Sequence, residues 1–199
     1  MLVDTERAAV ETEAAFLNEH GWPLTPDEVA ALFLGRTDAY MREVVQVRLP
    51  DLPPDWEQRL DERYLEAHTE LRPVDGIVEA LEQITLPTCV ASSGTQEKMR
   101  RTLGATGLYE RFKGRIFSTT EVQNGKPAPD LFLYAAERMG VEARACAVVE
   151  DSPFGVAAAL DAGMTVFAYA GGVMPAERLQ AAAVVFDDMR DLPRLLRGE

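Results

Sequence analysis

The sequence predicts an α/β protein with two parts, a doubly wound parallel sheet and an all-helical segment ahead of it. From about residue 76 onward, short apolar runs alternate with helical patterns, which is typical of right-handed strand–helix–strand units. From residue 5 to residue 71 only helical patterns occur. We therefore expect an inserted all-helical cap over residues 5–75 and a core formed by residues 1–4 and 76–199.

The cap should contain four helices, at about residues 5–20, 26–33, 38–49 and 55–71. Asp4 or Thr5 can cap the first of these helices. Thr25 and Glu28 flank Pro26 in the pattern of a capping box, which marks the start of the second helix. The cap is thus defined by local start signals.

The core should contain short strands joined by helices. Strands are expected at residues 88–91, 116–118, 145–149, 165–169 and 184–186, and helices at residues 76–84, 95–103, 130–139 and 154–162. The unbroken apolar run at 145–149 favours a strand covered by helices on both faces. Because ligands bind beyond the carboxyl ends of the strands in such sheets, polar residues that follow a strand are candidates for a site.

An excess of acidic residues limits the possible partners. The 33 Asp and Glu residues outnumber the 20 Lys and Arg residues, and the formal net charge of −13 argues against nucleic acid or an anionic membrane. No apolar stretch approaches the length of a transmembrane helix, and the amino terminus lacks a leader pattern, so we expect a cytoplasmic protein. A small-molecule partner and a monomer or weak dimer are expected.

The cysteines and histidines are expected to be structural. Cys89 and Cys146 lie in the expected strands and should be buried thiols with no redox or ligand role. His20 and His68 lie in the expected cap helices and should be exposed on them.

Two adjacent acids follow the apolar strand at 145–149. Glu150 and Asp151 suit a hard cation such as Mg²⁺, which takes one or two protein carboxylates and completes its shell with water and phosphate oxygens. The alternative is an acidic turn at a helix start, because acids also favour the positive end of the helix dipole.

Two further strand ends carry polar groups. Ser92, Ser93 and Gly94 precede a helix, where hydroxyls and free backbone N–H groups can bind an anion, although an ordinary helix cap is the alternative. Lys126 lies in a loop stiffened by two prolines and could be aimed at a ligand, although most lysines are simply solvated. Hydroxyls, a lysine and an acid pair together are what phosphoryl transfer needs, but no nucleophile is evident.

These residues resemble the motifs of the haloacid dehalogenase superfamily, in its helical-cap subfamily I of small sugar-phosphate phosphatases and phosphomutases. The sequence ASSG at residues 91–94 resembles the second motif of the family, GKPAPD at 125–130 the third, and VVEDSPFGVAAALDAGM at 148–164 the fourth. Three motifs in order behind a helical segment make the resemblance nearly full-length.

The resemblance implies a Rossmann-like parallel sheet core and Mg²⁺ as the cofactor. Ser92 and Lys126 would be catalytic residues that bind the transferring phosphoryl group, with Ser93 and Gly94 beside them. Glu150 and Asp151 would hold the metal ion. The cap would close over the site, and its loop at Gly35, Arg36 and Thr37 would contact the substrate.

One part of the family pattern is absent. Members of the family begin with a central strand that ends in Asp-x-Asp, where the first aspartate attacks phosphorus and the second is the general acid and base. This chain starts after that point, at a segment in which residues 2–6 (Leu2, Val3, Asp4, Thr5 and Glu6) match the family. We therefore expect that Met1 is a misplaced start and that the natural protein extends some ten residues upstream, so the chain as written should be poorly folded and inactive.

The predicted function is that of a Mg²⁺-dependent phosphomonoester hydrolase of this family. It would act on a small phosphorylated metabolite through an aspartyl-phosphate intermediate, and sugar phosphates are the favoured substrate class. Two alternatives stay open: a phosphomutase of the β-phosphoglucomutase type, and a catalytically inactive or truncated member that only binds a ligand. A dehalogenase is disfavoured because that chemistry needs no metal and leaves Glu150 and Asp151 unexplained.

Overall fold

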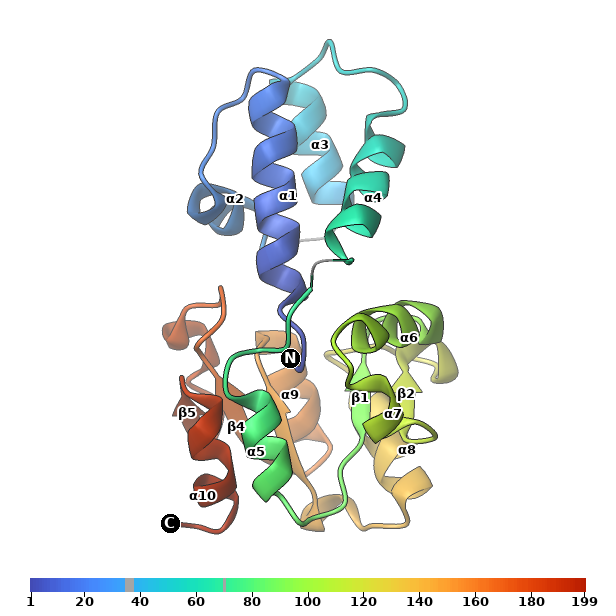
Figure 1. The fold of residues 1–199 in the computed structure, drawn as a ribbon, viewed down its shortest axis with the longest axis vertical. Helices are drawn as coiled ribbons and strands as arrows, with labels where there is room; N and C mark the ends of the chain where they lie inside the picture. The colour runs from blue at the N-terminus through green and yellow to red at the C-terminus, as the bar shows by residue number, and fades with distance from the viewer. Residues whose placement is uncertain (35–37, 70) are drawn as a thin grey trace. The chain divides into compact units, whose positions relative to one another are not determined.

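The computed structural model describes residues 1–34, 38–69 and 71–199, and it divides the chain into two compact units (Figure 1). The helical unit is Asp4–Leu71, and the α/β unit consists of Met1–Val3 and Arg72–Glu199. The three motifs at residues 91–94, 125–130 and 148–164 all lie in the α/β unit. Within the described ranges, no helix is both long and apolar enough to cross a membrane.

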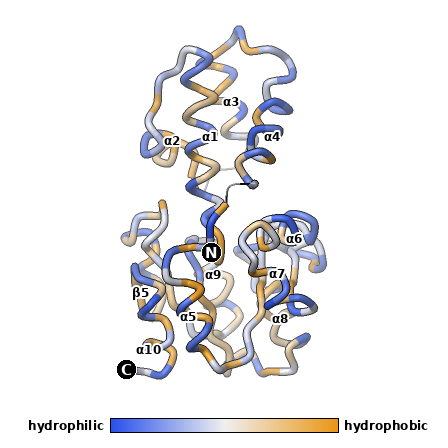
Figure 2. Tube along the Cα trace, viewed as in Figure 1, coloured by the Kyte–Doolittle hydropathy of each residue, from blue (hydrophilic) through white to orange (hydrophobic). Residues whose placement is uncertain are grey.

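The helical unit contains four helices in the described residues: α1 (Thr5–Glu19), α2 (Pro26–Phe33), α3 (Asp38–Arg48) and α4 (Trp56–Ala67). Helix α1 packs against α2 and α4. Hydrophobic and hydrophilic residues alternate along these helices (Figure 2), which lets each helix turn one face inward. The core between them includes the fully buried side chains of Leu17, Val29 and Val45.

The predicted capping box at the start of α2 is confirmed. The Thr25 hydroxyl accepts from the backbone N–H of Glu28 at 3.3 Å, and the Glu28 carboxylate accepts from the backbone N–H of Thr25 at 2.8 Å. The prediction that His68 is exposed is wrong, because its exposure is only 8%. Helix α4 ends at Ala67, so His68 is the residue that follows the helix and not part of its solvent face.

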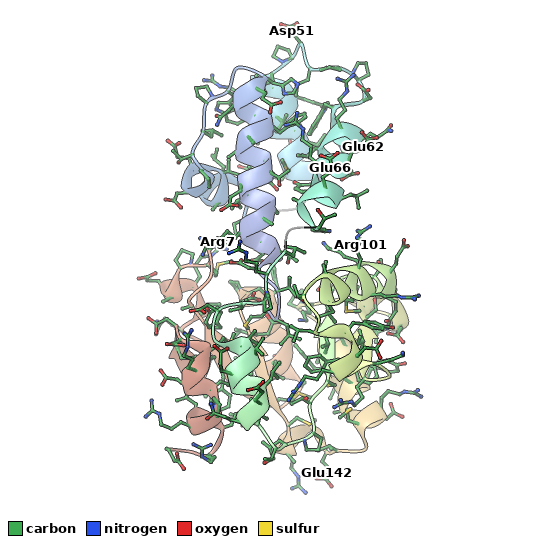
Figure 3. All side chains as sticks on the ribbon, in the orientation of Figure 1. Arg7, Asp51, Glu62, Glu66, Arg101 and Glu142 are labelled. Atoms are coloured by element: carbon green, nitrogen blue, oxygen red, sulfur yellow. The ribbon has the colours of Figure 1, made fainter. Side chains whose placement is uncertain are left out.

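Acidic side chains lie on the surfaces of both units. Figure 3 shows Asp51 and Glu62 projecting from the helical unit and Glu142 from the α/β unit, and all three are exposed. Exposed positions such as these are where charged side chains are usually found, because they stay in contact with water.

The α/β unit alternates strands and helices as the sequence predicts. Its strands are β1 (Val90–Ser92), β2 (Ile116–Ser118), β3 (Ala147–Glu150), β4 (Thr165–Tyr169) and β5 (Val184–Phe186). Its helices are α5 (Ile77–Gln83), α6 (Gln96–Ala105), α7 (Tyr109–Phe112), α8 (Asp130–Met139), α9 (Pro153–Asp161) and α10 (Leu192–Leu196). Short 3₁₀ helices lie at Thr119–Glu121, Ala143–Ala145, Ala176–Leu179 and Met189–Asp191.

The strands form two parallel sheets, one of order β1-β2 and one of order β3-β4-β5. Val148 pairs with Val166 and Phe167 with Val184, so the registers run without a break. Helix α8 packs on β1 and β2, helix α9 packs on β3 and β4, and the two helices contact each other. Figure 1 shows β1 and β2 on one side of the α/β unit and β4 and β5 on the other.

The facing edges of the two sheets are open. In the part of the chain that the structure describes, β1 pairs with β2 alone and β3 with β4 alone. All three residues of β1 are partly exposed and Ala147 of β3 is exposed, whereas β4, paired on both sides, buries four of its five residues. Apolar strands with open edges and partly exposed side chains leave hydrogen-bonding groups without ladder partners.

The open edges also explain a wrong prediction about the two cysteines. Cys89 and Cys146 were expected inside buried strands, but each lies one residue before its strand and each is only partly buried. They precede β1 and β3, the two strands whose inner edges are open. Both thiols are free.

Candidate active site

The carboxylate of Glu150 is held by the amino-terminal turn of α9. Strand β3 ends at Glu150, whose Oε2 accepts from the backbone N–H of Asp151 at 3.0 Å and from the backbone N–H of Ser152 at 3.2 Å. The Ser152 hydroxyl donates to the same oxygen at 3.0 Å and accepts from the backbone N–H of Gly155 at 3.0 Å. Ser152 thus caps α9 and anchors Glu150 with one hydroxyl.

Lys126 forms a buried ion pair with this carboxylate. Its ammonium donates to Oε1 of Glu150, and the two side chains are each only 9% exposed. The same ammonium donates to the carbonyl oxygen of Ala91 at 3.3 Å and lies 4.7 Å from the centre of the Phe132 ring. The solvated-lysine alternative is therefore wrong, because Lys126 connects the carboxyl end of β1 to that of β3.

The loop that carries Lys126 is closed at its base. Asp130 accepts from the backbone N–H of Asn124 at 3.2 Å and from the side-chain amide of Asn124 at 3.0 Å. Gly125 lies close to the Thr119 side chain, so a larger residue there would not fit without a shift. These contacts fix the direction in which Lys126 leaves the loop.

The two acids at the end of β3 differ in their ease of ionisation. Burial disfavours the charged form of Glu150 most strongly, but the Lys126 charge and hydrogen bond, with help from the Met1 ammonium, hold the pKa of Glu150 below its usual value. Burial and the neighbouring Glu150 charge raise the pKa of Asp151, although the Met1 ammonium and Lys126 oppose them. A cation added beside Asp151 would oppose this shift, because it stabilises the ionised form of a neighbouring carboxylate.

Ser92 lies at the end of β1 with its hydroxyl partly committed. Its Oγ accepts from the backbone N–H of Gly94 at 3.1 Å, which leaves the hydroxyl proton able to donate to a ligand. Ser93, the next residue, is exposed. The predicted substrate residues Gly35, Arg36 and Thr37 lie outside the described residues.

Ser118 is a buried polar residue that the sequence reasoning did not single out. It pairs in register with Ser92, is fully buried, and donates from Oγ to the carbonyl oxygen of Gly94 at 2.7 Å. The same oxygen accepts from the backbone N–H of Thr120 at 3.1 Å. Ser118 thereby holds the turn after Ser92, and its place at the end of an expected strand was the signal that could have found it.

We expect Ser118→Ala to loosen the turn at Ser92 and Gly94. Losing the Ser118 hydroxyl leaves the partly buried Gly94 carbonyl without this donor, which should lower the free energy of unfolding by about 0.5 to 1.5 kcal/mol. Inhibition by inorganic phosphate should weaken several-fold. Urea unfolding and an inhibition titration measure both, with the exposed Thr85→Ala as the matched control. Equal behaviour of the two variants would contradict this role of Ser118.

A family model described as haloacid dehalogenase-like hydrolase matches residues 1–169. The chain belongs to this family. The match covers the helical unit and the α/β unit through β4, and so includes Ser92, Lys126, Glu150 and Asp151.

Other members of the haloacid dehalogenase-like family resemble this chain over nearly its whole length. The 6-phosphogluconate phosphatase of Escherichia coli is 29% identical over 99% of this chain and 90% of its own. A haloacid dehalogenase-like protein from Agrobacterium tumefaciens has a TM-score of 0.89 at 29% identity, covering 99% of this chain and 93% of that one. A family hydrolase from Deinococcus radiodurans, solved with bound phosphate and sodium, has the same TM-score at 28% identity, covering 99% and 91%. The fold and the predicted family are confirmed.

Glu150 and Asp151 can supply some, but not all, of the ligands that a hard cation needs. Glu150 and Asp151 supply two adjacent carboxylates, a donor set that suits Mg²⁺ when water and a phosphate complete the shell. In the described part of the chain, no three His, Cys, Asp or Glu side chains come together as a ready-made metal cluster. A metal held here would therefore need oxygen ligands beyond these two side chains.

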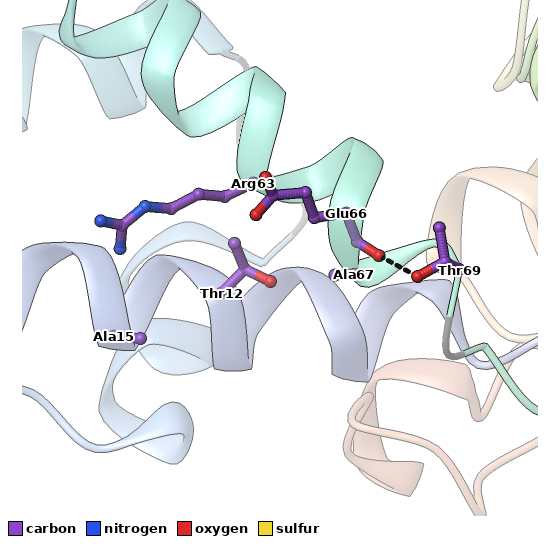
Figure 4. A pocket seen from close by; sticks show the side chains of 6 residues that line it. All are labelled: Thr12, Ala15, Arg63, Glu66, Ala67 and Thr69. Carbon is purple, nitrogen blue, oxygen red and sulfur yellow. Dashed lines mark hydrogen bonds between the residues drawn. The ribbon is translucent and has the colours of Figure 1, made fainter.

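A separate hollow lies in the helical unit, between α1 and α4 (Figure 4). It has a volume of about 360 Å³, and its lining includes Thr12, Arg63 and Thr69. The Arg63 guanidinium is engaged by Glu19 at 2.5 Å, and the Thr69 hydroxyl donates to the Glu66 carbonyl oxygen at 2.7 Å. The Thr12 hydroxyl donates to the Ala8 carbonyl oxygen at 2.7 Å, so the arginine and both threonine hydroxyls of this hollow are already paired. The candidate active site therefore remains the one at the sheet edge.

Proposed function

We propose that this protein is a Mg²⁺-dependent phosphomonoesterase that acts on a small phosphorylated metabolite, with sugar phosphates as the substrate class. The observation that carries the proposal is the buried Lys126–Glu150 pair beside Asp151, at the edge where β1 and β3 end. A buried lysine paired with Glu150, which Asp151 follows in the sequence, provides opposite charges for a phosphoryl group and for its counter-cation.

Different residues of the chain would bind the phosphoryl group, the metal ion and the rest of the substrate. Lys126 and the Ser92 hydroxyl would bind the phosphoryl oxygens, with the backbone N–H groups at Ser93 and Gly94 beside them. Glu150 and Asp151 would hold Mg²⁺. When bound, Mg²⁺ would neutralise charge on the phosphoryl oxygens. The helical unit would exclude water from the site, and Gly35, Arg36 and Thr37 would contact the rest of the substrate.

We further propose that a nucleophilic aspartate is carried by an additional parallel strand between β1 and β3. The open inner edges of these strands and their partly exposed side chains support it. The aspartate would form an aspartyl phosphate that water then hydrolyses.

Known relatives support the substrate class. The E. coli relative is a 6-phosphogluconate phosphatase, and the D. radiodurans structure holds phosphate. A cytoplasmic location and a monomer or weak dimer stay predictions.

The test uses the full-length protein, meaning the chain as its gene encodes it with any residues ahead of Met1. We expect it to release phosphate from members of a panel of sugar phosphates when Mg²⁺ is present and to stop when the metal is chelated. Phosphate release is measured for each compound with and without Mg²⁺. Isomerisation of a sugar phosphate without phosphate release would indicate the phosphomutase instead. A rise in melting temperature with a phosphorylated compound but no turnover would indicate a ligand-binding member.

A further inference from the structure

The Glu150 carboxylate presses against a glycine. Gly155 lies in the first turn of α9 and is buried. A Cβ built on it would come within 3.0 Å of all three atoms of the Glu150 carboxyl group. No other residue type could stand there without moving Glu150 or α9, because every other side chain carries a Cβ.

The Glu150 carboxylate cannot move aside without breaking its hydrogen bonds. The far end of a side chain can usually rotate away from an added methyl group. This one is held on Oε1 by Lys126 and on Oε2 by Asp151 and Ser152, at 3.0 to 3.2 Å for the latter oxygen. Moving it would break hydrogen bonds to a buried charge, which are among the stronger ones in proteins.

We propose that Gly155 is a positioning residue for the active site: the absence of its side chain lets Glu150 lie against α9 and hold Lys126 at the ends of β1 and β3. The inference rests on the proposed function for the role of the Glu150–Lys126 pair. Gly155 touches neither the substrate nor the metal ion in this proposal and acts through Glu150.

Gly104 offers a matched control. It also lies inside a helix, α6, and a Cβ built on it meets nothing within 4 Å. Glycine disfavours helices relative to alanine, so Gly104→Ala should leave the melting temperature unchanged or raise it. Gly155→Ala brings the same gain in helix propensity, and any loss therefore reports the contact with Glu150.

The experiment compares the unchanged full-length protein with Gly155→Ala, Gly104→Ala, Glu150→Asp and the double variant Gly155→Ala/Glu150→Asp. Melting temperature is measured by calorimetry and Mg²⁺ affinity by titration with Mg²⁺ alone. We expect Gly155→Ala to lower the melting temperature by roughly 5 to 10 °C and to weaken Mg²⁺ binding at least tenfold. Aspartate withdraws the carboxylate by about 1.5 Å, the length of one C–C bond, so the double variant should recover a large part of both losses relative to Glu150→Asp.

Each outcome decides the inference. Gly155 does not position Glu150 if Gly155→Ala matches Gly104→Ala in both measurements. The same conclusion follows if adding Glu150→Asp to Gly155→Ala recovers neither the melting temperature nor the Mg²⁺ affinity. If Gly155→Ala fails to fold, folding of the double variant supports the inference and its failure to fold overturns it. If the unchanged protein binds no Mg²⁺, the proposed metal site fails, while the coupling of residues 155 and 150 in melting temperature still tests this inference.

Discussion

The 199-residue chain alone is expected to release no phosphate above background, whereas the full-length protein with a strand between β1 and β3 is expected to be active. The difference should be about 10⁴-fold or more, because losing a nucleophile removes the chemical step itself. Burial of five apolar side chains of that strand, at about 1.5 to 3 kcal/mol each, should also add about 10 kcal/mol of stability. Phosphate release and urea unfolding of the two chains measure both effects.

Two controls separate folding from chemistry in this comparison. Asparagine in place of the first aspartate of the added strand should keep the stability and lose the turnover. Backbone amides of β1 and β3 should exchange hydrogen more slowly when the strand is present, because their open edges become paired. Robust Mg²⁺-dependent turnover by the 199-residue chain would refute the idea, as would the lack of an in-frame Asp-x-Asp after an apolar run in the bases ahead of Met1.

Lys126→Met in the full-length enzyme should have the second largest effect. It removes the cation proposed to face the phosphoryl group, and kcat should fall by about 10² to 10³-fold, as for the loss of one well-placed donor. It also leaves the buried carboxylate of Glu150 without its partner, which should cost about 3 to 5 kcal/mol of stability. Steady-state kinetics and urea unfolding measure the two losses.

An exposed lysine provides the control for this variant. Lys113 pairs with Glu110 at 3.2 Å, but its side chain is 61% exposed, so Lys113→Met should change stability by less than about 0.5 kcal/mol. The double variant Lys126→Met/Glu150→Gln should regain much of the stability and none of the activity, because it removes both buried charges. If Lys126→Met kept most of its kcat, Lys126 would not serve the reaction.

Local patterns predicted most elements of the fold. The capping box at Thr25, the strand at 165–169 and the helix at 130–139 depend on residues close in sequence, and the structure has them as expected. The helices α7 and α10 were missed because segments of four and five residues carry too little periodicity. Strand ends were displaced by one or two residues at β1 and β3, where the edges are open.

The amino-acid sequence by itself determined the order of strands and helices, the family motifs, and the polar residues at each strand end, since all of these are written in neighbouring residues. Tertiary structure alone decided that Lys126 is buried against Glu150, that Ser118 holds Gly94, and that Gly155 makes room for a carboxylate. Lys126 and Glu150 are 24 residues apart, as are Ser118 and Gly94. Their contacts exist only because parallel strands bring distant carboxyl ends to one edge, which no local pattern of side chains records.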